Sequence, residues 1–205
     1  MLAIVDYRMG NIQSLCNALS FLGCEAVVTR DLDTLNKADK IILPGVGAFD
    51  AAMSNLDRFG LRGGLNKIAA RGQTPIFGIC VGMQILALSG TENGFCRGLG
   101  WIDASVEKIT PKDSVTRIPH VGFNEVTLRP GNADLEDAIP GSTDLYFVHS
   151  YHMVCRHPTD VVATVEYGGE TLTVMVRRNN LWGAQFHPEK SQSNGLKILR
   201  KFLVS

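Results

Sequence analysis

The segment Gly78-Ile79-Cys80-Val81-Gly82 follows an apolar run at residues 75–77 and precedes a helical stretch at 83–88. A buried strand that turns sharply into a helix lifts one side chain out of the sheet, as in a nucleophile elbow. Glycine on both sides of the cysteine allows such a turn and leaves room for a substrate carbonyl. A helix N-terminus behind the sulfur favours the thiolate. We therefore predict that Cys80 is a nucleophile; the alternative is a structural cysteine, since free cysteines are usually buried.

A thiol nucleophile needs a base, and the segment Gln185-Phe186-His187-Pro188-Glu189 offers one. Pro188 favours an extended conformation at His187, and in an extended chain residues i and i+2 point to the same side. Glu189 can therefore support the imidazole of His187. Because proline has no N–H, this segment is expected at the end of a strand, where side chains can reach a cleft. Together with the elbow, the pattern predicts a Cys-His-Glu triad.

Length and charge limit the functions that the chain can have. Its 205 residues suit one domain, which we place at residues 1–205. The formal net charge is zero, which gives no electrostatic basis for binding nucleic acid or an anionic membrane. No apolar run approaches the roughly 18 residues that span a bilayer, and the apolar start at residues 2–5 is too short for a signal peptide. The five cysteines are odd in number and lack a C-x-x-C spacing, so reduced thiols in the cytoplasm are expected.

The first half of the chain alternates two kinds of segment. Strands are expected at residues 2–5, 26–29, 40–43 and 75–79, and helices at 11–22, 49–59 and 61–71. This alternation is typical of a parallel sheet that is covered on both faces. After Gly100 the pattern favours strands separated by turns, at residues 105–109, 123–128, 144–148, 161–167, 171–176 and 181–186. Several of these should add to the same sheet in antiparallel fashion, and a final helix should follow Ser191.

The segment Pro44-Gly45-Val46-Gly47 lies between an expected strand and an expected helix. It does not fit a dinucleotide fingerprint, because Asp50 stands where the third glycine should be. We expect its glycines to aim backbone N–H groups at the oxyanion of a tetrahedral intermediate. A plain strand-to-helix turn is the alternative.

A zinc site could be imagined at His149-x-x-His152-x-x-Cys155. A spacing of three in an extended chain sends His149 and His152 to opposite faces, which disfavours it. We therefore expect no metal and no cofactor, and expect His149 or His152 to pack or to hydrogen-bond near the cleft.

Three motifs taken in order, Pro44 to Phe49, Gly78 to Gln84 and Gln185 to Ser191, closely resemble those of the triad glutamine amidotransferases. Within that family, the resemblance to the glutaminase subunits of imidazole glycerol phosphate synthase runs along the whole chain. It implies an α/β, class I glutamine amidotransferase-like (flavodoxin-like) fold. Such a fold has a mostly parallel central sheet, helices on both faces and antiparallel additions from the second half. The implied activity is hydrolysis of L-glutamine to glutamate and ammonia through a cysteine thioester.

The resemblance also assigns roles by position. It makes Cys80 the nucleophile, His187 the general base and acid, and Glu189 the group that orients the imidazole. The implied oxyanion site consists of Gly45, Val46, Gly47 and Val81. Glutamine recognition falls on Gln84, Glu92, Ser150 and Tyr151, with Glu92 facing the substrate ammonium. The implied partner interface consists of Pro119, His120, Gly122, Phe123 and Asn124.

The glutaminase features occupy the whole sequence, so we expect the ammonia to be used by another protein. In the resembled family the partner is a (β/α)8-barrel synthase that forms a heterodimer with the glutaminase and acts in histidine biosynthesis. Phe123 stands where the family usually has tryptophan, and paralogous subunits supply ammonia to enzymes that amidate surface sugars. Two alternatives of other classes are a stand-alone cysteine hydrolase and a non-catalytic interaction module.

Overall fold

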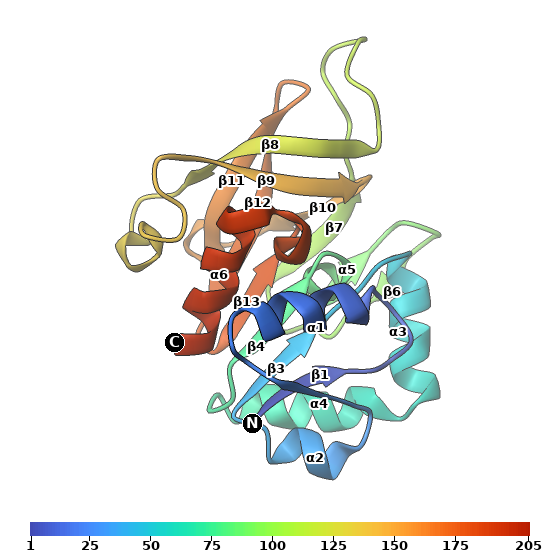
Figure 1. The fold of residues 1–205 in the computed structure, drawn as a ribbon. Helices are drawn as coiled ribbons and strands as arrows, with labels where there is room; N and C mark the ends of the chain where they lie inside the picture. Colours follow the sequence, from blue (N-terminus) through green and yellow to red (C-terminus); the bar gives the residue numbers. More distant parts are fainter.

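A computed structural model describes all of residues 1–205 and contains a single mixed sheet. Four strands from the N-terminal half and one from the C-terminal part build its parallel portion, in the spatial order β2-β1-β3-β4-β13 (Figure 1). These strands are short and mostly apolar: β1 (Leu2–Val5), β2 (Ala26–Thr29), β3 (Lys40–Leu43), β4 (Ile76–Ile79) and β13 (Leu181–Ala184). Strand β13 comes from the C-terminal part of the chain and runs parallel to β4. The carboxyl ends of β4 and β13 therefore lie side by side.

Helices cover both faces of this parallel sheet, as the alternating pattern predicts. They are α1 (Ile12–Phe21), α2 (Leu32–Asn36), α3 (Phe49–Arg58), α4 (Leu61–Ala70) and α6 (Gln192–Val204). In Figure 1, α1 and α6 lie in front of the sheet and α4 lies behind it. Asn11 caps α1, since its side chain accepts a hydrogen bond from the N–H of Ser14. Helix α2 was not anticipated.

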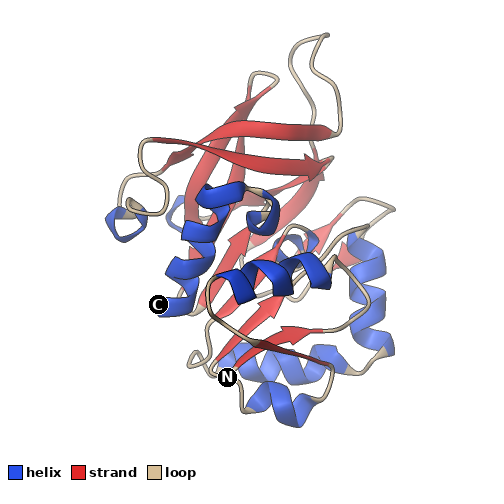
Figure 2. Cartoon of the chain, viewed as in Figure 1, coloured by secondary structure: helices blue, strands red, loops and turns tan.

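The strands from β5 to β12 extend the sheet, mostly through antiparallel pairings (Figure 2). Strand β12 joins β13, and β11 joins β12 to β8. The strands are β5 (Ser89–Gly90), β6 (Cys96–Arg97), β7 (Ala104–Lys108), β8 (His120–Leu128), β9 (Ser142–His149), β10 (Tyr151–Cys155), β11 (Val161–Tyr167) and β12 (Glu170–Arg178). Three single turns of 3₁₀ helix are η1 (Ala133–Leu135), η2 (Pro158–Asp160) and η3 (Pro188–Lys190). The expected antiparallel additions are confirmed, whereas β5, β6 and β10 were not anticipated.

The pair β8 and β9 has two different faces, because side chains alternate along a strand. His120 lies directly opposite His149, and both are buried on the inner face. Val121, Phe123 and Val148 project from the outer face, where they are 54%, 46% and 37% exposed. The outer face thus carries apolar side chains that the chain itself leaves uncovered.

The helix after the elbow is shorter than the sequence predicts. Helix α5 spans only Val81–Gln84, and the expected continuation through residue 88 is wrong. The carbonyl groups of the next residues instead accept hydrogen bonds from a returning loop: Ile85 from Leu99, Leu86 from Trp101 and Ile102, and Ala87 from Gly100. The N–H groups of Leu86 and Ala87 bond to carbonyls only three residues earlier, and the N–H of Leu88 donates to Ala104 on β7 instead of Gln84. The α-helical bonding therefore ends, and the chain turns into β5.

One continuous core of buried apolar side chains lies between the sheet and its helices. On α6 the fully buried apolar residues are Ile198, Leu199 and Phe202. Leu196 and Leu203, which have helical spacing with Leu199, are only partly buried. None of the helices is long and apolar enough to cross a membrane.

Candidate active site

Cys80 lies between β4 and α5 in a backbone conformation that few side chains adopt. Its φ is +54° and its ψ is −112°. A residue other than glycine with positive φ costs of order 1–3 kcal/mol and persists only where the surroundings hold it. Here the Cys80 N–H donates to the carbonyl of Ala184 on β13, at 2.7 Å. The cysteine therefore occupies a strained elbow that two adjacent strands hold in place.

The flanking glycines have a different role from the one we expected. Neither Gly78 nor Gly82 has a positive φ, so the unusual backbone conformation belongs to Cys80 itself. A Cβ atom on Gly78 would lie 2.4 Å from the carbonyl oxygen of Gly82, and one on Gly82 would lie 1.8 Å from that of Leu43. The glycines thus allow the elbow and α5 to pack directly against the backbone of β3 and β4.

His187 and Glu189 meet as their spacing predicts. The backbone of His187 is extended, with φ −97° and ψ 98°, and its Nδ1 lies 2.8 Å from Oε1 of Glu189. Both side chains are nearly inaccessible, at 2% and 5% exposure. The N–H of His187 donates to the carbonyl of Tyr146, and its own carbonyl accepts from Oγ of Ser191. Hydrogen bonds therefore hold both backbone groups of His187, while Glu189 holds its imidazole.

The Nε2 atom of His187 is buried and has no hydrogen-bond partner. Burial by itself would lower the pKa of His187, but the neighbouring Cys80 and Glu189 outweigh burial and raise that pKa to about 9. The raised pKa favours a protonated His187 imidazole at neutral pH. The structure thus brings Cys80 close to His187 and Glu189, which lie more than a hundred residues further along the chain.

The predicted oxyanion segment lies directly against the elbow. A Cβ atom on Gly45 would be 2.6 Å from the nitrogen of Gly82 and 2.9 Å from the hydroxyl of Tyr7. That hydroxyl donates to the carbonyl of Pro44. Gly47 has a φ of +123°, which side chains rarely adopt. Gly45, Val46 and Gly47 therefore form a loop that touches the turn containing the Val81 N–H.

The predicted glutamine-binding residues also gather around the elbow. Nε2 of Gln84 donates to the carbonyl of Tyr151, at 2.9 Å. Oε2 of Glu92 accepts from the N–H of Phe49 at the start of α3, and the carbonyl of Glu92 accepts from the hydroxyl of Tyr151. The carbonyl of Ser150 accepts from the N–H of Ile109. Hydrogen bonds thus connect Gln84, Tyr151 and Glu92 to one another and to the end of the oxyanion loop.

Two residues that the sequence analysis did not assign contact this site. Gln185 is fully buried, and its Nε2 lies 3.7 Å from Sγ of Cys80. Tyr7 is also buried, and its hydroxyl lies against Gly45 of the predicted oxyanion segment. Burial, and secondarily the charge of Cys80, raises the pKa of Tyr7. Gln185 stands two residues before His187, and the same i, i+2 argument that linked His187 to Glu189 could have drawn attention to it.

The predicted interface segment lies on β8 and just before it. Pro119 and Phe123 are exposed, and Gly122 and Asn124 are partly buried. The ring of Phe123 packs edge-on against that of Tyr146, with 5.4 Å between centroids. His120 differs from the others because it is completely buried.

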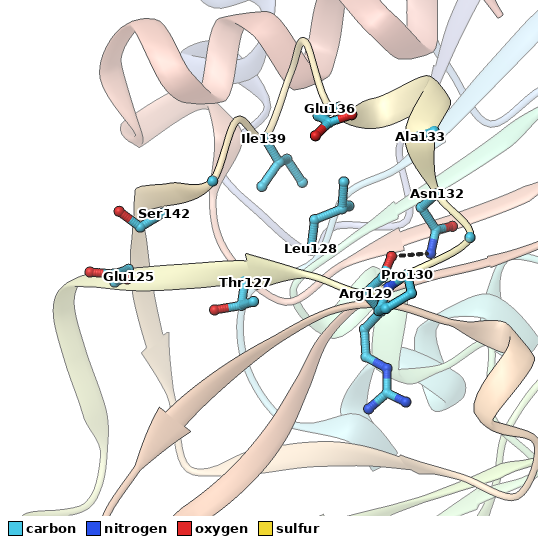
Figure 3. Close-up of a pocket in the computed structure, with 12 residues that line it drawn as sticks. Glu125, Thr127, Leu128, Arg129, Pro130, Asn132, Ala133, Glu136, Ile139 and Ser142 are labelled. Atoms are coloured by element: carbon cyan, nitrogen blue, oxygen red, sulfur yellow. Dashed lines mark hydrogen bonds between the residues drawn. The ribbon is translucent and has the colours of Figure 1, made fainter.

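The structure contains no group of three or more residues that could hold a metal ion. His149 contacts His120 and the carbonyl of Tyr151, which agrees with the expected hydrogen-bonding role. A cavity of about 520 Å³ lies between β8 and the loop at residues 129–142 (Figure 3). Its lining includes none of the residues of the predicted site, so we assign it no part in the chemistry.

The family to which the chain belongs follows from comparison with known proteins. Residues 3–205 match the profile of the family described as glutamine amidotransferase class-I. The chain belongs to the class-I glutamine amidotransferases.

Two relatives of this amidotransferase match it along nearly their whole length. A protein of Methanococcus maripaludis, named imidazole glycerol phosphate synthase subunit HisH 2, is 41% identical over 99% of this chain and 98% of its own. A protein of Rhodospirillum rubrum, named imidazole glycerol phosphate synthase subunit HisH, is 44% identical over 98% and 97%.

Solved structures confirm the fold of the amidotransferase. A crystal structure of a glutamine amidotransferase has a TM-score of 0.74 at 23% identity, covering 99% of this chain and 97% of that one. The glutaminase domain of Trypanosoma brucei CTPS, with bound acivicin, has a TM-score of 0.64 at 12% identity, covering 100% and 94%. The predicted α/β fold of the class I amidotransferases is therefore confirmed.

Proposed function

We propose that this chain is the glutaminase subunit of an imidazole glycerol phosphate synthase in histidine biosynthesis. In this role it hydrolyses L-glutamine and delivers the ammonia to a partner synthase. Full-length relatives that carry the name of this subunit support the assignment. The observation that carries the chemistry is the strained Cys80 beside the buried His187–Glu189 pair.

The reaction follows from the positions of these groups. The Cys80 thiolate attacks the side-chain amide carbon of glutamine, and the carbonyl oxygen becomes an oxyanion. The N–H groups of the loop at Gly45 to Gly47 and of Val81 stabilise this oxyanion, each donor contributing about 3–4 kcal/mol. The proton on Nε2 of His187 passes to the leaving nitrogen, so ammonia departs and a γ-glutamyl thioester remains.

Hydrolysis of the thioester reverses the proton movement. His187, now neutral, removes a proton from water as the water oxygen attacks the thioester carbon. Collapse of the second tetrahedral intermediate releases glutamate and the Cys80 thiolate, which leaves His187 protonated again. Glu189 keeps Nδ1 protonated throughout and so directs Nε2 toward the reacting atoms.

We assign the partner to the outer face of β8 and β9. Val121, Phe123 and Val148 form an exposed apolar patch there, and the ring of Tyr146 packs against Phe123. The carbonyl of Tyr146 also holds the N–H of His187. A synthase that covers this patch, a (β/α)8 barrel by resemblance, would lie over the strand that positions the base. All five cysteines are free thiols, which suits a reducing cytoplasm.

The test combines the purified chain with the histidine-pathway synthase of the same genome. We expect glutamine hydrolysis that the partner stimulates, and no hydrolysis by Cys80→Ala. The glutamine analogue 6-diazo-5-oxonorleucine should label Cys80. The chain should also restore growth without histidine to a strain that lacks this subunit. Full turnover without the partner would favour a stand-alone hydrolase, and an unreactive Cys80 would favour a non-catalytic module.

A further inference from the structure

Two buried histidines form a hydrogen-bonded pair across strands β8 and β9. Nδ1 of His120 lies 3.0 Å from Nε2 of His149. Nε2 of His120 lies 2.6 Å from Nδ2 of Asn124, and Nδ1 of His149 lies 2.9 Å from the carbonyl oxygen of Tyr151. All four ring nitrogens therefore have partners.

The Tyr151 carbonyl determines the direction of every bond in this row. A carbonyl oxygen only accepts, so Nδ1 of His149 carries the proton and its Nε2 must accept. Nδ1 of His120 must then donate, and its Nε2 accepts from the amide of Asn124. Both rings are thus neutral with the proton on Nδ1. This state agrees with burial, which lowers the pKa of His120 to about 4 and that of His149 to about 3.

The row continues from Tyr151 to the sulfur. The same carbonyl also accepts from Nε2 of Gln84, which donates to Oε1 of Gln185, at 2.9 Å in both cases. Nε2 of Gln185 then faces Sγ of Cys80 at 3.7 Å. Since Nε2 of Gln84 donates both to the Tyr151 carbonyl and to Gln185, a displacement of that carbonyl would displace both glutamine side chains.

Aromatic packing keeps the histidine pair rigid. The ring of His120 stacks on Tyr167 and on Phe147, with centroid distances of 3.9 and 4.6 Å. His120 is fully buried and therefore cannot contact a partner itself. Its neighbour Asn124 lies at the partly exposed end of the row, on the strand that carries the outer apolar patch.

We propose that His120 and His149 are positioning residues for glutamine recognition. Their fixed tautomers hold the Tyr151 carbonyl, and through it the amides of Gln84 and Gln185, beside Cys80. This inference rests on the proposed glutaminase function, because it concerns the pocket that the substrate enters.

The kinetic test uses the complex of the full chain with its partner synthase. His149→Leu removes the donor to Tyr151, and we expect the KM for glutamine to rise about tenfold, with a smaller change in kcat. His149→Asn places an amide N–H near the position of Nδ1, so its KM should stay within about threefold of the wild-type value. Phe202→Leu is the control for loss of packing, because Phe202 is buried on α6 against Phe77 and Trp182 and does not contact the histidine pair. Its melting temperature should fall while KM stays within about twofold.

Equal KM values for the two His149 variants, or a KM for Phe202→Leu as high as that of His149→Leu, would overturn the proposal. A second measurement does not depend on the variants folding. In ¹⁵N NMR spectra of the wild-type chain, both rings should show a protonated Nδ1 and an unprotonated Nε2, and the reverse would also overturn it. If the wild-type complex hydrolyses no glutamine, that result contradicts the proposed function. The NMR measurement of the tautomers is independent of it and still tests the arrangement of the histidine pair.

Discussion

The parallel and antiparallel parts of the sheet contribute to the site in different ways. In the parallel part, the nucleophile is held by backbone: Cys80 has a positive φ, and Gly82 allows contact with Leu43 that a side chain would block. The antiparallel part supplies hydrogen bonds that hold the base and the substrate pocket: the carbonyl of Tyr146 on β9 accepts from the N–H of His187, and Nδ1 of His149 donates to the carbonyl of Tyr151. Changes in the first part should therefore affect folding and catalysis together, whereas changes in the second should separate them.

The largest effect that keeps the fold is expected from Glu189→Gln. Without the carboxylate, Nδ1 of His187 no longer has an anionic acceptor, and kcat should fall about 10³–10⁴-fold. The melting temperature should change far less than the rate. Exposed Glu136, remote from the site, provides the matched control, and Glu136→Gln should keep full activity. A fall in kcat of less than tenfold would contradict a role for Glu189 in orienting the base.

The same variant has a testable pH dependence. The folded-state pKa of His187, about 9, lies above its ordinary value of 6.5. Its protonation therefore adds stability that is complete below pH 6.5 and is lost as the pH rises through 9. The difference in unfolding free energy between wild type and Glu189→Gln should shrink across this window in urea titrations. A constant difference would show that Glu189 does not support the charged imidazole.

Gly82→Ala should be the most destabilising of these changes. The added Cβ would meet the carbonyl of Leu43 at 1.8 Å, and neither backbone can move without displacing a strand. We expect a loss of about 3 kcal/mol in unfolding free energy, together with loss of activity. Gly63 in α4 is exposed with no atom near its Cβ position, so Gly63→Ala should instead stabilise by about 0.5–1 kcal/mol. Equal stability of the two variants would refute the packing argument.

Phe123→Ala tests the outer face of the antiparallel part. Truncating the exposed ring should raise the dissociation constant for the partner synthase about 10–100-fold, as measured by calorimetry, and leave the melting temperature within a few degrees. Phe21 is also highly exposed but lies at the end of α1, and Phe21→Ala should bind the partner normally. Weakened binding by both variants alike would argue against this patch as the interface.

The smallest effect is expected from Gly47→Ala. We propose that a backbone flip at Gly45 to Gly47 completes the oxyanion site when the partner synthase has bound its own substrate. Alanine is strained at the observed φ of +123°, so it should weaken the present conformation and raise the basal rate. The stimulation by the partner should then fall about fivefold, with little change in the KM for glutamine. Equal effects on stimulation and on KM would exclude this switch.

Local patterns were sufficient to predict the framework of the site. The apolar run before Gly78 predicts β4, and the chain does turn at Cys80. The i, i+2 spacing of His187 and Glu189 predicts their contact, because extended geometry depends on adjacent residues alone. The nearness of Cys80 to His187, more than a hundred residues apart, was inferred from chemistry and resemblance rather than from any local signal.

The features that the sequence analysis predicted wrongly or did not predict have a common cause. Helix α5 ends at Gln84, and the N–H of Leu88, which would bond to the Gln84 carbonyl in a continuing helix, donates to the distant Ala104 carbonyl. The fixed tautomers of His120 and His149, and the contact of Gln185 with Cys80, likewise depend on partners from distant segments.

The sequence by itself determined the parallel strand-helix framework, the elbow at residue 80 and the pairing of an imidazole with a carboxylate. Only the tertiary structure decided how far the helix behind the elbow extends, which polar groups face the sulfur and which side of β8 is buried. The physical reason is that backbone geometry is set by neighbouring residues, whereas a hydrogen-bond donor or acceptor binds whichever partner the folded chain brings to it.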